Sequence, residues 1–363
     1  MSRKKAVFLY ESKRMRWFAL AGIIAGVLFT ILMMHEFKGA FEDGSFYLGG
    51  GINFGFCKML GSASILIVGC IAVMSIFQFS DWHKKSTQEY LLSLPFTQKE
   101  RFLAKALCGY GTILLSGITV LLGMIYVRNC YITEFWKNLS GIAYSDIIMG
   151  NNTMWQLIQL GLQLILMMLA LYSIFLLAHI LVSRGIVAGI GTGMSFAPIY
   201  LWSVGYVLLY DGWFFREMQL DIPKYREWGQ YLGLCVGSGF RSTDMCSQME
   251  SSSYYIIVNY SNFWLMLFAA FATIFIIGGL AYWISGRVDM ARTGIVVQKK
   301  SARSFISAGM GVCFGTAFGL LGAYFVGYRV SGGDCLLVFI MLSIVVGTLV
   351  YLFMKKMLSI SFQ

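Results

Sequence analysis

The segment that spans residues 81–105 carries the clearest functional pattern in the sequence. It reads Asp-Trp-His-Lys-Lys-Ser-Thr-Gln-Glu-Tyr-Leu-Leu-Ser-Leu-Pro-Phe-Thr-Gln-Lys-Glu-Arg-Phe-Leu-Ala-Lys, a charged run with an apolar patch near its centre. Pro95 disfavours helical geometry in the residue before it, so we expect a helix to break there. Thr97 can then cap a new helix, with Glu100 at the capping-box position three residues later. The pattern predicts a rigid helix-break-helix elbow that runs into a membrane helix and can pass a push from a soluble partner into the bilayer.

This elbow resembles a loop found in the permease subunits of type-two ABC exporters of the Firmicutes or clostridial type. The pattern of that loop is roughly basic-Gly-Thr-x-Glu-x-Leu-Leu-Ser-Leu-Pro-(Val/Ile)-(Ser/Thr)-(Arg/Lys)-x-Glu, followed by Ala-Lys. The matching residues are Thr87, Glu89, Leu91, Leu92, Ser93, Leu94, Pro95, Thr97, Glu100, Ala104 and Lys105. Ser86 and Gln98 depart from the pattern. A second segment, residues 287–294, resembles an Arg-x-x-Glu-x-Ala-Gly-like loop of longer clostridial permeases, with departures at Asp289 and Thr293.

The resemblance implies a transmembrane permease subunit that exports a hydrophobic cargo, such as a peptide, an antibiotic or other drug, or a lipid. In that family the loop is a coupling helix that contacts a cytosolic ABC ATPase, so it implies ATPase-coupling roles for Lys85, Thr87, Glu89, Leu91, Leu92, Leu94, Pro95 and Glu100. ATP and Mg would be bound by that ATPase subunit, and this chain would hold no cofactor. A second permease, identical or related, would complete the pathway.

Catalytic motifs are missing from the sequence. A phosphate loop needs Gly-x-x-x-x-Gly-Lys-Ser/Thr, and the look-alike at residues 237–243 lacks the lysine. No Gly-x-Ser-x-Gly elbow appears, and no cysteine and histidine residues have the spacing of a zinc site. We therefore expect no catalytic residue, no metal and no enzyme activity in this chain.

The composition predicts a membrane protein, because 58% of the residues are hydrophobic and only 12% are charged. A soluble domain carries roughly 25% charged residues, and a spanning helix needs about 20 apolar residues. Stretches that are free of Asp, Glu, Lys and Arg cover residues 17–34, 59–80, 106–127, 153–182, 186–209, 263–285, 304–328 and 335–354. We expect an all-α integral membrane protein with about eight transmembrane helices, cytosolic N- and C-termini and small extracytoplasmic loops.

The basic residues set the expected orientation. With both termini in the cytosol, 19 of the 28 Lys and Arg residues lie inside, but only 5 of the 17 acidic residues do. An excess of Lys and Arg on the cytosolic side is the established orientation signal. The net charge is thus a feature of membrane topology rather than of nucleic-acid binding. The expected location is the bacterial cytoplasmic membrane, among membrane lipids, as a multi-pass cell-membrane protein.

The domain organisation follows from these spans. Residues 1–285 are expected to form a six-helix exporter permease core, with a basic leader (1–16), the coupling loop (81–105) and an outer cap loop (210–262). Residues 286–363 would add a cytosolic loop and two further transmembrane helices. Cys235 and Cys246 share the cap loop and could pair.

Some polar and small residues inside the spans leave alternatives open. His179 is interpreted as a hydrogen-bonded or interfacial histidine in preference to a proton relay. Gln159 and Gln163, on one helix face with Gln156, either line a substrate pathway or bond a neighbouring helix. Glycine ridges serve packing within the chain or between subunits; they comprise Gly22 and Gly26; Gly185, Gly189 and Gly193; and Gly311, Gly315 and Gly319.

Two other classes of function remain open. A self-sufficient secondary transporter or channel would need polar groups inside the membrane, and the predicted spans hold no formally charged residue. A membrane enzyme acting on lipids or peptides would gather catalytic residues at one membrane face.

Overall fold

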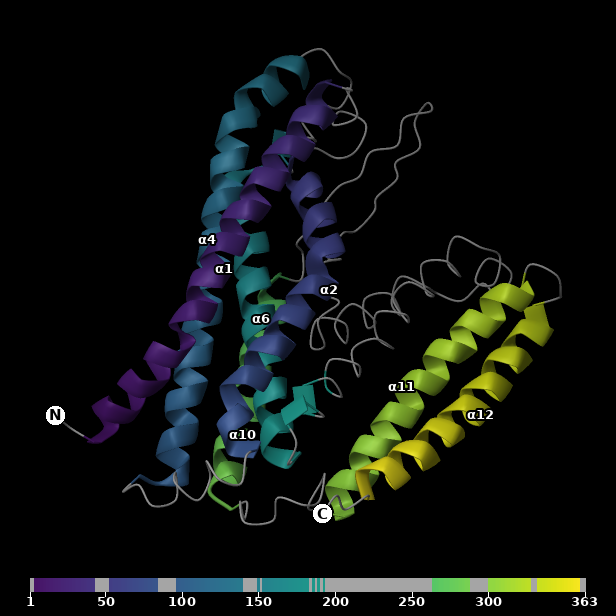
Figure 1. Ribbon diagram of the computed structural model, residues 1–363. Helices are drawn as coiled ribbons and strands as arrows, with labels where there is room; N and C mark the ends of the chain where they lie inside the picture. Colours follow the sequence, from purple (N-terminus) through teal and green to yellow (C-terminus); the bar gives the residue numbers. More distant parts are fainter. Residues whose placement is uncertain are drawn as a thin grey trace. The chain divides into compact units, whose positions relative to one another are not determined.

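The computed structural model describes residues 3–42, 52–83, 96–139, 149–150, 152–182, 185–186, 188–189, 192, 263–287, 300–327 and 332–359. Every regular element in these ranges is a helix (Figure 1). They are α1 (Arg3–Glu42), α2 (Ile52–Phe79), the short 3-10 helix η2 (Ser80–His83), α4 (Gln98–Leu139), α6 (Met154–Leu181), α10 (Phe263–Ser285), α11 (Lys300–Gly327) and α12 (Gly332–Ser359). Helices satisfy their own backbone groups, as a segment surrounded by lipid must.

Six of the described helices are long and apolar enough to cross a membrane. Their candidate spans are Lys5–Gly39, Gln98–Lys137, Met154–Leu181, Leu267–Ser285, Ile306–Ala323 and Leu337–Ser359, and a shorter apolar helix covers Leu66–Trp82. The described part of the chain is therefore all-helical and has the character of a multi-pass membrane protein, as predicted. The predicted fifth span, residues 186–209, lies almost wholly outside the described residues. The count of eight spans and the cytosolic termini stay predictions.

The helix ends differ from the predicted spans in an informative way. α10 begins and ends at the predicted residues, whereas α1 and α4 contain 40 and 42 residues. At 1.5 Å per residue each is about 60 Å long, roughly twice the hydrocarbon thickness of a bilayer. The basic leader is, from Arg3 onward, the first part of α1. Residues 35–42 and 128–139, predicted as parts of loops, instead extend α1 and α4.

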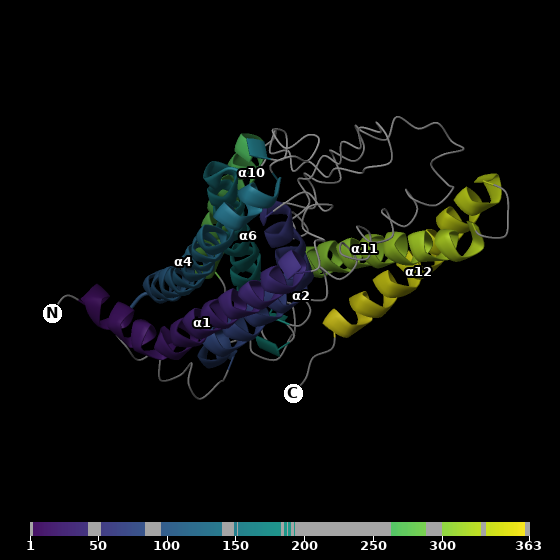
Figure 2. The same ribbon diagram turned by 90° about the horizontal axis from the view of Figure 1, so that it is seen from above.

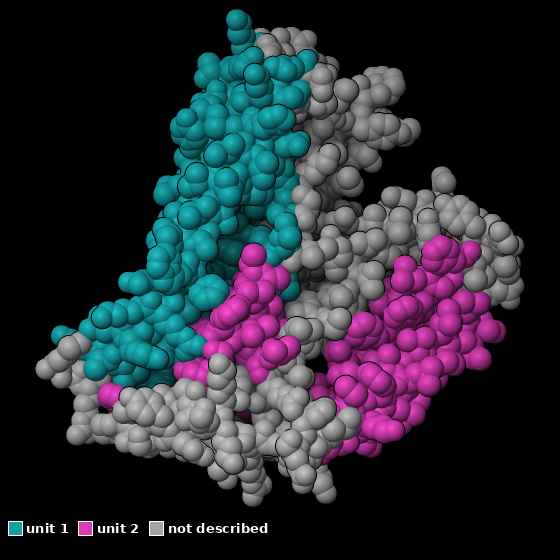
Figure 3. Space-filling view, viewed as in Figure 1, with its two compact units in different colours: residues 1–68, 100–172, 239–275 teal, residues 69–99, 173–238, 276–363 magenta. Residues whose placement is uncertain are grey.

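The chain divides into two compact units, which are coloured in Figure 3. Unit 1 comprises Met1–Val68, Glu100–Tyr172 and Gly239–Phe275; unit 2 comprises Gly69–Lys99, Ser173–Ser238 and Ile276–Gln363. Each unit is described by itself below.

Small residues bring α1 and α4 together within unit 1. A Cβ atom at Gly22 would overlap the Ser116 side chain, and one at Gly26 would lie 3.0 Å from Thr119 Cγ2. Further along both helices, Gly123 lies against Thr30. This glycine ridge therefore packs within the chain, where small residues allow two helices to approach closely.

The order of these contacts shows that α1 and α4 are parallel. Residues 22, 26 and 30 of α1 meet residues 116, 119 and 123 of α4 in the same order. Figures 1 and 2 both show the two helices side by side. If both cross the bilayer, they cross it in the same direction. The leader and the end of the predicted elbow then lie at the same membrane face.

An aromatic cluster joins the opposite ends of α1 and α4 to the start of α2. The Phe37 ring lies 4.7 Å from the Phe56 ring, and Phe41 stacks on Tyr131 at 5.2 Å between ring centres. Phe135 meets Phe41 edge-on at 6.3 Å, and the Tyr131 hydroxyl donates a 3.2 Å hydrogen bond to the Met34 carbonyl. Packed aromatic pairs of this kind stabilise beyond the burial of their area and hold the three helix ends together.

In unit 2, α11 and α12 form an antiparallel hairpin around a glycine ridge. A Cβ atom at Gly311 would lie 2.7 Å from the Gly347 carbonyl oxygen, and one at Gly319 would lie 2.8 Å from the Phe339 carbonyl oxygen. Between them, Gly315 faces the backbone of Ser343. This ridge also packs within the chain, which resolves the alternative left open by the sequence. In the third ridge, Gly189 lies against Ile76, and Gly193 lies outside the described residues.

Candidate functional site

The candidate coupling site is the region where the predicted elbow enters α4. α4 begins at Gln98, so Thr97 occupies the N-cap position and Glu100 the third helical position, as the sequence predicted. A carboxylate in the first turn also interacts favourably with the helix dipole. Glu100 is described, whereas the other predicted coupling residues lie outside the described residues; these are Lys85, Thr87, Glu89, Leu91, Leu92, Leu94 and Pro95.

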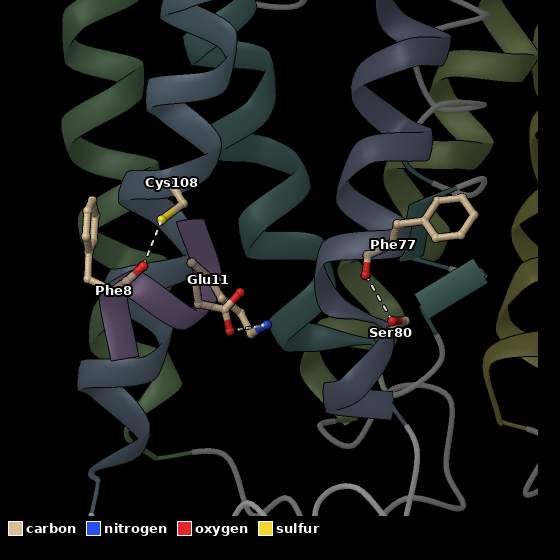
Figure 4. Close-up of polar contacts among 6 residues, drawn as sticks. Phe8, Glu11, Phe77, Ser80 and Cys108 are labelled. Atoms are coloured by element: carbon tan, nitrogen blue, oxygen red, sulfur yellow. Dashed lines mark hydrogen bonds and ion pairs between the residues drawn. The ribbon is translucent and has the colours of Figure 1, made fainter. Parts of the chain in front are cut away.

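A buried ion pair fixes the leader to the base of α4. Lys105 Nζ lies 2.9 Å from Glu11 Oε1, and the two side chains are 1% and 4% exposed (Figure 4). One turn away, Cys108 Sγ lies 3.9 Å from the Phe8 carbonyl oxygen. Because both charges are buried, losing either partner is costly. The first turns of α1 and α4 should therefore move together.

Sequence reasoning missed this pair, because it had identified Lys105 but not Glu11. Lys105 was counted as part of the elbow and as an inside charge, and Glu11 is the one acidic residue in the basic leader. That isolated acid was the available signal. Its partner depends on the register between α1 and α4, which no local pattern encodes.

In unit 2, the start of α4 contacts the end of α10. Lys99 Nζ lies 5.7 Å from the centre of the Tyr282 ring, and the same side chain fills the space beside Gly286. The Arg287 guanidinium carbon lies 3.8 Å above the Trp283 ring. Cations are favoured near a helix C-terminus and over aromatic rings. The entry to α4 and the first residues after α10 are thus adjacent, and Lys99 and Arg287 belong to the two segments that resemble permease loops.

The end of α2 is organised by a buried histidine on α6. His179 Nε2 and Ser75 Oγ are 3.0 Å apart, and the imidazole stacks on Phe79 with 5.0 Å between ring centres. The Trp82 ring of η2 meets Phe79 edge-on. After the α2 helix ends, the Ser80 hydroxyl donates a 2.9 Å hydrogen bond to the Phe77 carbonyl (Figure 4). His179 is therefore hydrogen-bonded and buried, the interpretation that the sequence favoured over a proton relay.

The glutamines of α6 separate into two roles. Gln159 and Gln163 are 8% and 6% exposed, so both face the protein interior within the single chain. Their assignment to a substrate pathway stays a prediction. Gln156 instead accepts a 3.1 Å hydrogen bond from the Thr153 backbone N–H, and its own N–H donates to Thr153 Oγ1 at 3.3 Å. This is a reciprocal capping box, which the Thr-x-x-Gln spacing could have revealed.

We expect Thr153→Ala to lower the free energy of unfolding by about 1 kcal/mol, because it removes the N-cap oxygen of α6. Thr153→Ser keeps that oxygen and should restore most of the lost stability. The check is the midpoint of unfolding by sodium dodecyl sulfate, followed by tryptophan fluorescence of the purified chain. Equal midpoints for the alanine and serine variants would contradict the capping role.

In the described part of the chain, no group of three His, Cys, Asp or Glu side chains could hold a metal ion. Cys70, Cys108, Cys130 and Cys313 are free thiols, and the predicted Cys235–Cys246 pair lies outside the described residues. No known protein family, curated protein or solved structure matches this chain.

Proposed function

We propose that this chain is the transmembrane permease subunit of an ATP-driven ABC exporter that moves a hydrophobic cargo across the cytoplasmic membrane of a bacterium. The observation that carries the proposal is the elbow at residues 81–105, whose sequence resembles the coupling loop of such permeases. Its last residues are the first turns of a 42-residue helix long enough to cross the bilayer. A displacement of the elbow would therefore act directly on a membrane helix.

The contacts of the described residues suggest how that displacement would spread. The buried Glu11–Lys105 pair links the base of α4 to α1, which runs parallel to it. Lys99 links the start of α4 to the end of α10 through Tyr282. An ATPase that pushes on the elbow would thus act on α1 through the ion pair and on the end of α10 through Lys99. Alternating access driven from one membrane face needs such a transfer of motion from helix to helix.

The proposal assigns the energy source to other chains. Two cytosolic ATPase subunits would bind ATP and Mg and dock on residues 84–101, aided by the 286–303 loop. Two permeases, identical or related, would form the pathway between them. A pathway without formal charges fits a peptide, an antibiotic or other drug, or a lipid, because burying an unpaired charge in lipid is costly.

We expect Leu92→Ala and Glu89→Gln to reduce, by about tenfold or more, the ATPase activity that copurifies with the tagged full-length chain, as loss of an interface hot spot does. The amount of chain in the membrane should not change, because neither residue lies in a predicted span. The measurement is ATP hydrolysis per tagged chain after purification in mild detergent.

Matched controls are Leu66→Ala and Glu36→Gln, which remove the same groups from exposed positions on α2 and α1. Both controls should keep the wild-type ATPase activity. Unchanged complex formation and unchanged transport in the two elbow variants would refute the coupling role. Transport by the purified chain alone in liposomes would favour a secondary transporter or channel instead.

A further inference from the structure

A buried arginine points at the beginning of α6. Arg128 lies in α4, near the end opposite the leader, and its side chain is 7% exposed. Its Nη2 donates a 2.9 Å hydrogen bond to the Asn152 carbonyl oxygen, while its buried Nε has no hydrogen-bond partner. A guanidinium carries five N–H donors and stays charged in proteins. One neutral carbonyl therefore satisfies only part of this group.

The surroundings of Arg128 are held in place by a hydrogen-bond network. Asn152 Oδ1 accepts a 2.9 Å hydrogen bond from the Asn53 backbone N–H, and Asn53 Nδ2 donates to the Thr153 carbonyl at 3.2 Å. The Thr153–Gln156 capping box continues the network into the first turn of α6. The guanidinium thus faces a fixed helix start rather than a loosely held segment.

The electrostatics of this position favour an anion. The N-terminus of the 28-residue α6 carries the positive end of its dipole, and Arg128 adds a full positive charge beside it. No carboxylate of the described residues forms an ion pair with Arg128. A buried cation without a counter-charge is costly. An oxyanion that accepts from both the guanidinium and a helix start would offset that cost.

Two exposed tryptophans indicate the depth of this position in the membrane. Trp155 follows the start of α6 and is 54% exposed, and Trp136 lies two turns beyond Arg128 and is 44% exposed. Tryptophan is enriched at the level of the lipid headgroups. A phosphate group is the oxyanion most abundant at that level.

We propose that Arg128, with Asn152 and the start of α6, binds a phosphate group at the membrane surface opposite the leader. The phosphate is that of a phospholipid headgroup or of a phosphate-bearing molecule in the water phase. Arginine suits this role because its planar donors match two oxygens of one phosphate. The site does not depend on coupling to an ATPase.

The test is the thermal unfolding midpoint of the full chain in dodecyl maltoside micelles, which carry no phosphate, at constant ionic strength with chloride as the reference anion. One arm adds phosphatidylglycerol to the micelles, and the other adds inorganic phosphate. A ligand that binds only the folded state raises the midpoint in a concentration-dependent way. We expect a rise of several degrees in at least one arm, and the responding arm identifies the source.

Arg128→Gln should abolish the rise, and Arg128→Lys should weaken it because a lysine cannot bond two oxygens in parallel. Lys38→Gln is the matched control, because it removes an exposed positive charge near the C-terminal end of α1. This variant should keep the rise. Should Arg128→Gln fail to fold, the dose dependence in the wild type and in Arg128→Lys still decides the question.

Three results would overturn the proposal. One is a wild-type midpoint that responds to neither anion, and another is an equal rise in Arg128→Gln. The third concerns two aspartates that lie outside the described residues. Asp43 directly follows α1 in the sequence, and Asp146 lies between α4 and α6. If Asp43→Asn or Asp146→Asn destabilises the chain as Arg128→Gln does, and added phosphate has no effect on the wild type, the chain itself supplies the anion.

Discussion

Lys105→Met should lower the free energy of unfolding by about 3–5 kcal/mol, the range measured when one partner of a buried ion pair is removed. The substitution leaves the Glu11 carboxylate 4% exposed and without its cation at 2.9 Å. Methionine fills a similar volume, so the loss reports on the charge rather than on a cavity. The midpoint of unfolding by sodium dodecyl sulfate, followed by tryptophan fluorescence, measures the effect.

The double variant Glu11→Gln/Lys105→Met separates the ion pair from other effects of the substitution. Removing both charges takes away both members of this pair, so the double variant should be more stable than Lys105→Met alone. Lys13→Met removes an exposed lysine from α1, two residues from Glu11, and should have a much smaller effect. The pair would be ruled out as a structural link if Lys105→Met were as stable as Lys13→Met, or if the double variant gained nothing.

The same pair bears on the proposed transport mechanism. Lys105 is the last residue of the elbow pattern, and Glu11 belongs to the leader, so one contact joins the two segments. If an ATPase pushes on the elbow, the double variant should fold yet transmit that push less well to α1. Stability and ATPase activity, measured on the same preparation, would distinguish a folding role from a coupling role.

The sequence predicted the bounds of a membrane helix best where the helix ends at the same residues as its apolar, charge-free run. α10 begins and ends at the predicted positions, because polar segments flank its apolar run on both sides. For α1 and α4 the charge-free runs gave only the central parts. Hydropathy indicates which residues can lie in lipid. A helix can continue beyond those residues, where its side chains favour helical geometry and adjacent helices pack against it. The turns around Glu11 and Tyr131 continue α1 and α4 beyond the apolar runs, and both turns contact a partner helix.

The candidate site was predicted in part, for a similar reason. The start of α4 after Thr97 follows from local capping chemistry, which a short sequence window contains. The Glu11–Lys105 and Arg128–Asn152 contacts join different helices, so they depend on helix register. The sequence could show that Gly22 and Gly311 lie on ridges of small residues, but not which helix fills each ridge. Small residues permit a close approach without specifying the partner.

Gly315→Ala should destabilise the α11–α12 hairpin by about 1–3 kcal/mol, the usual cost of overpacking a tight contact. A Cβ atom at this position would overlap the Ser343 carbonyl oxygen and lie 2.9 Å from Gly347 Cα. Both are backbone atoms of α12, which cannot turn aside as a side chain can. The two helices must therefore separate, and Gly315→Leu should separate them further. The unfolding midpoint of the full chain and the rate of proteolysis between the two helices measure the loss.

Gly309→Ala is the matched control on the same helix, because a Cβ atom there would meet nothing within 4 Å. Alanine has the higher helix propensity, so this variant should match or exceed the wild type by up to about 1 kcal/mol. The opposite signs of the two substitutions distinguish close packing from a general effect of replacing glycine. If Gly315→Ala behaved like Gly309→Ala, α12 would not lie against this ridge, and the ridge would be free to meet a second copy of the chain instead.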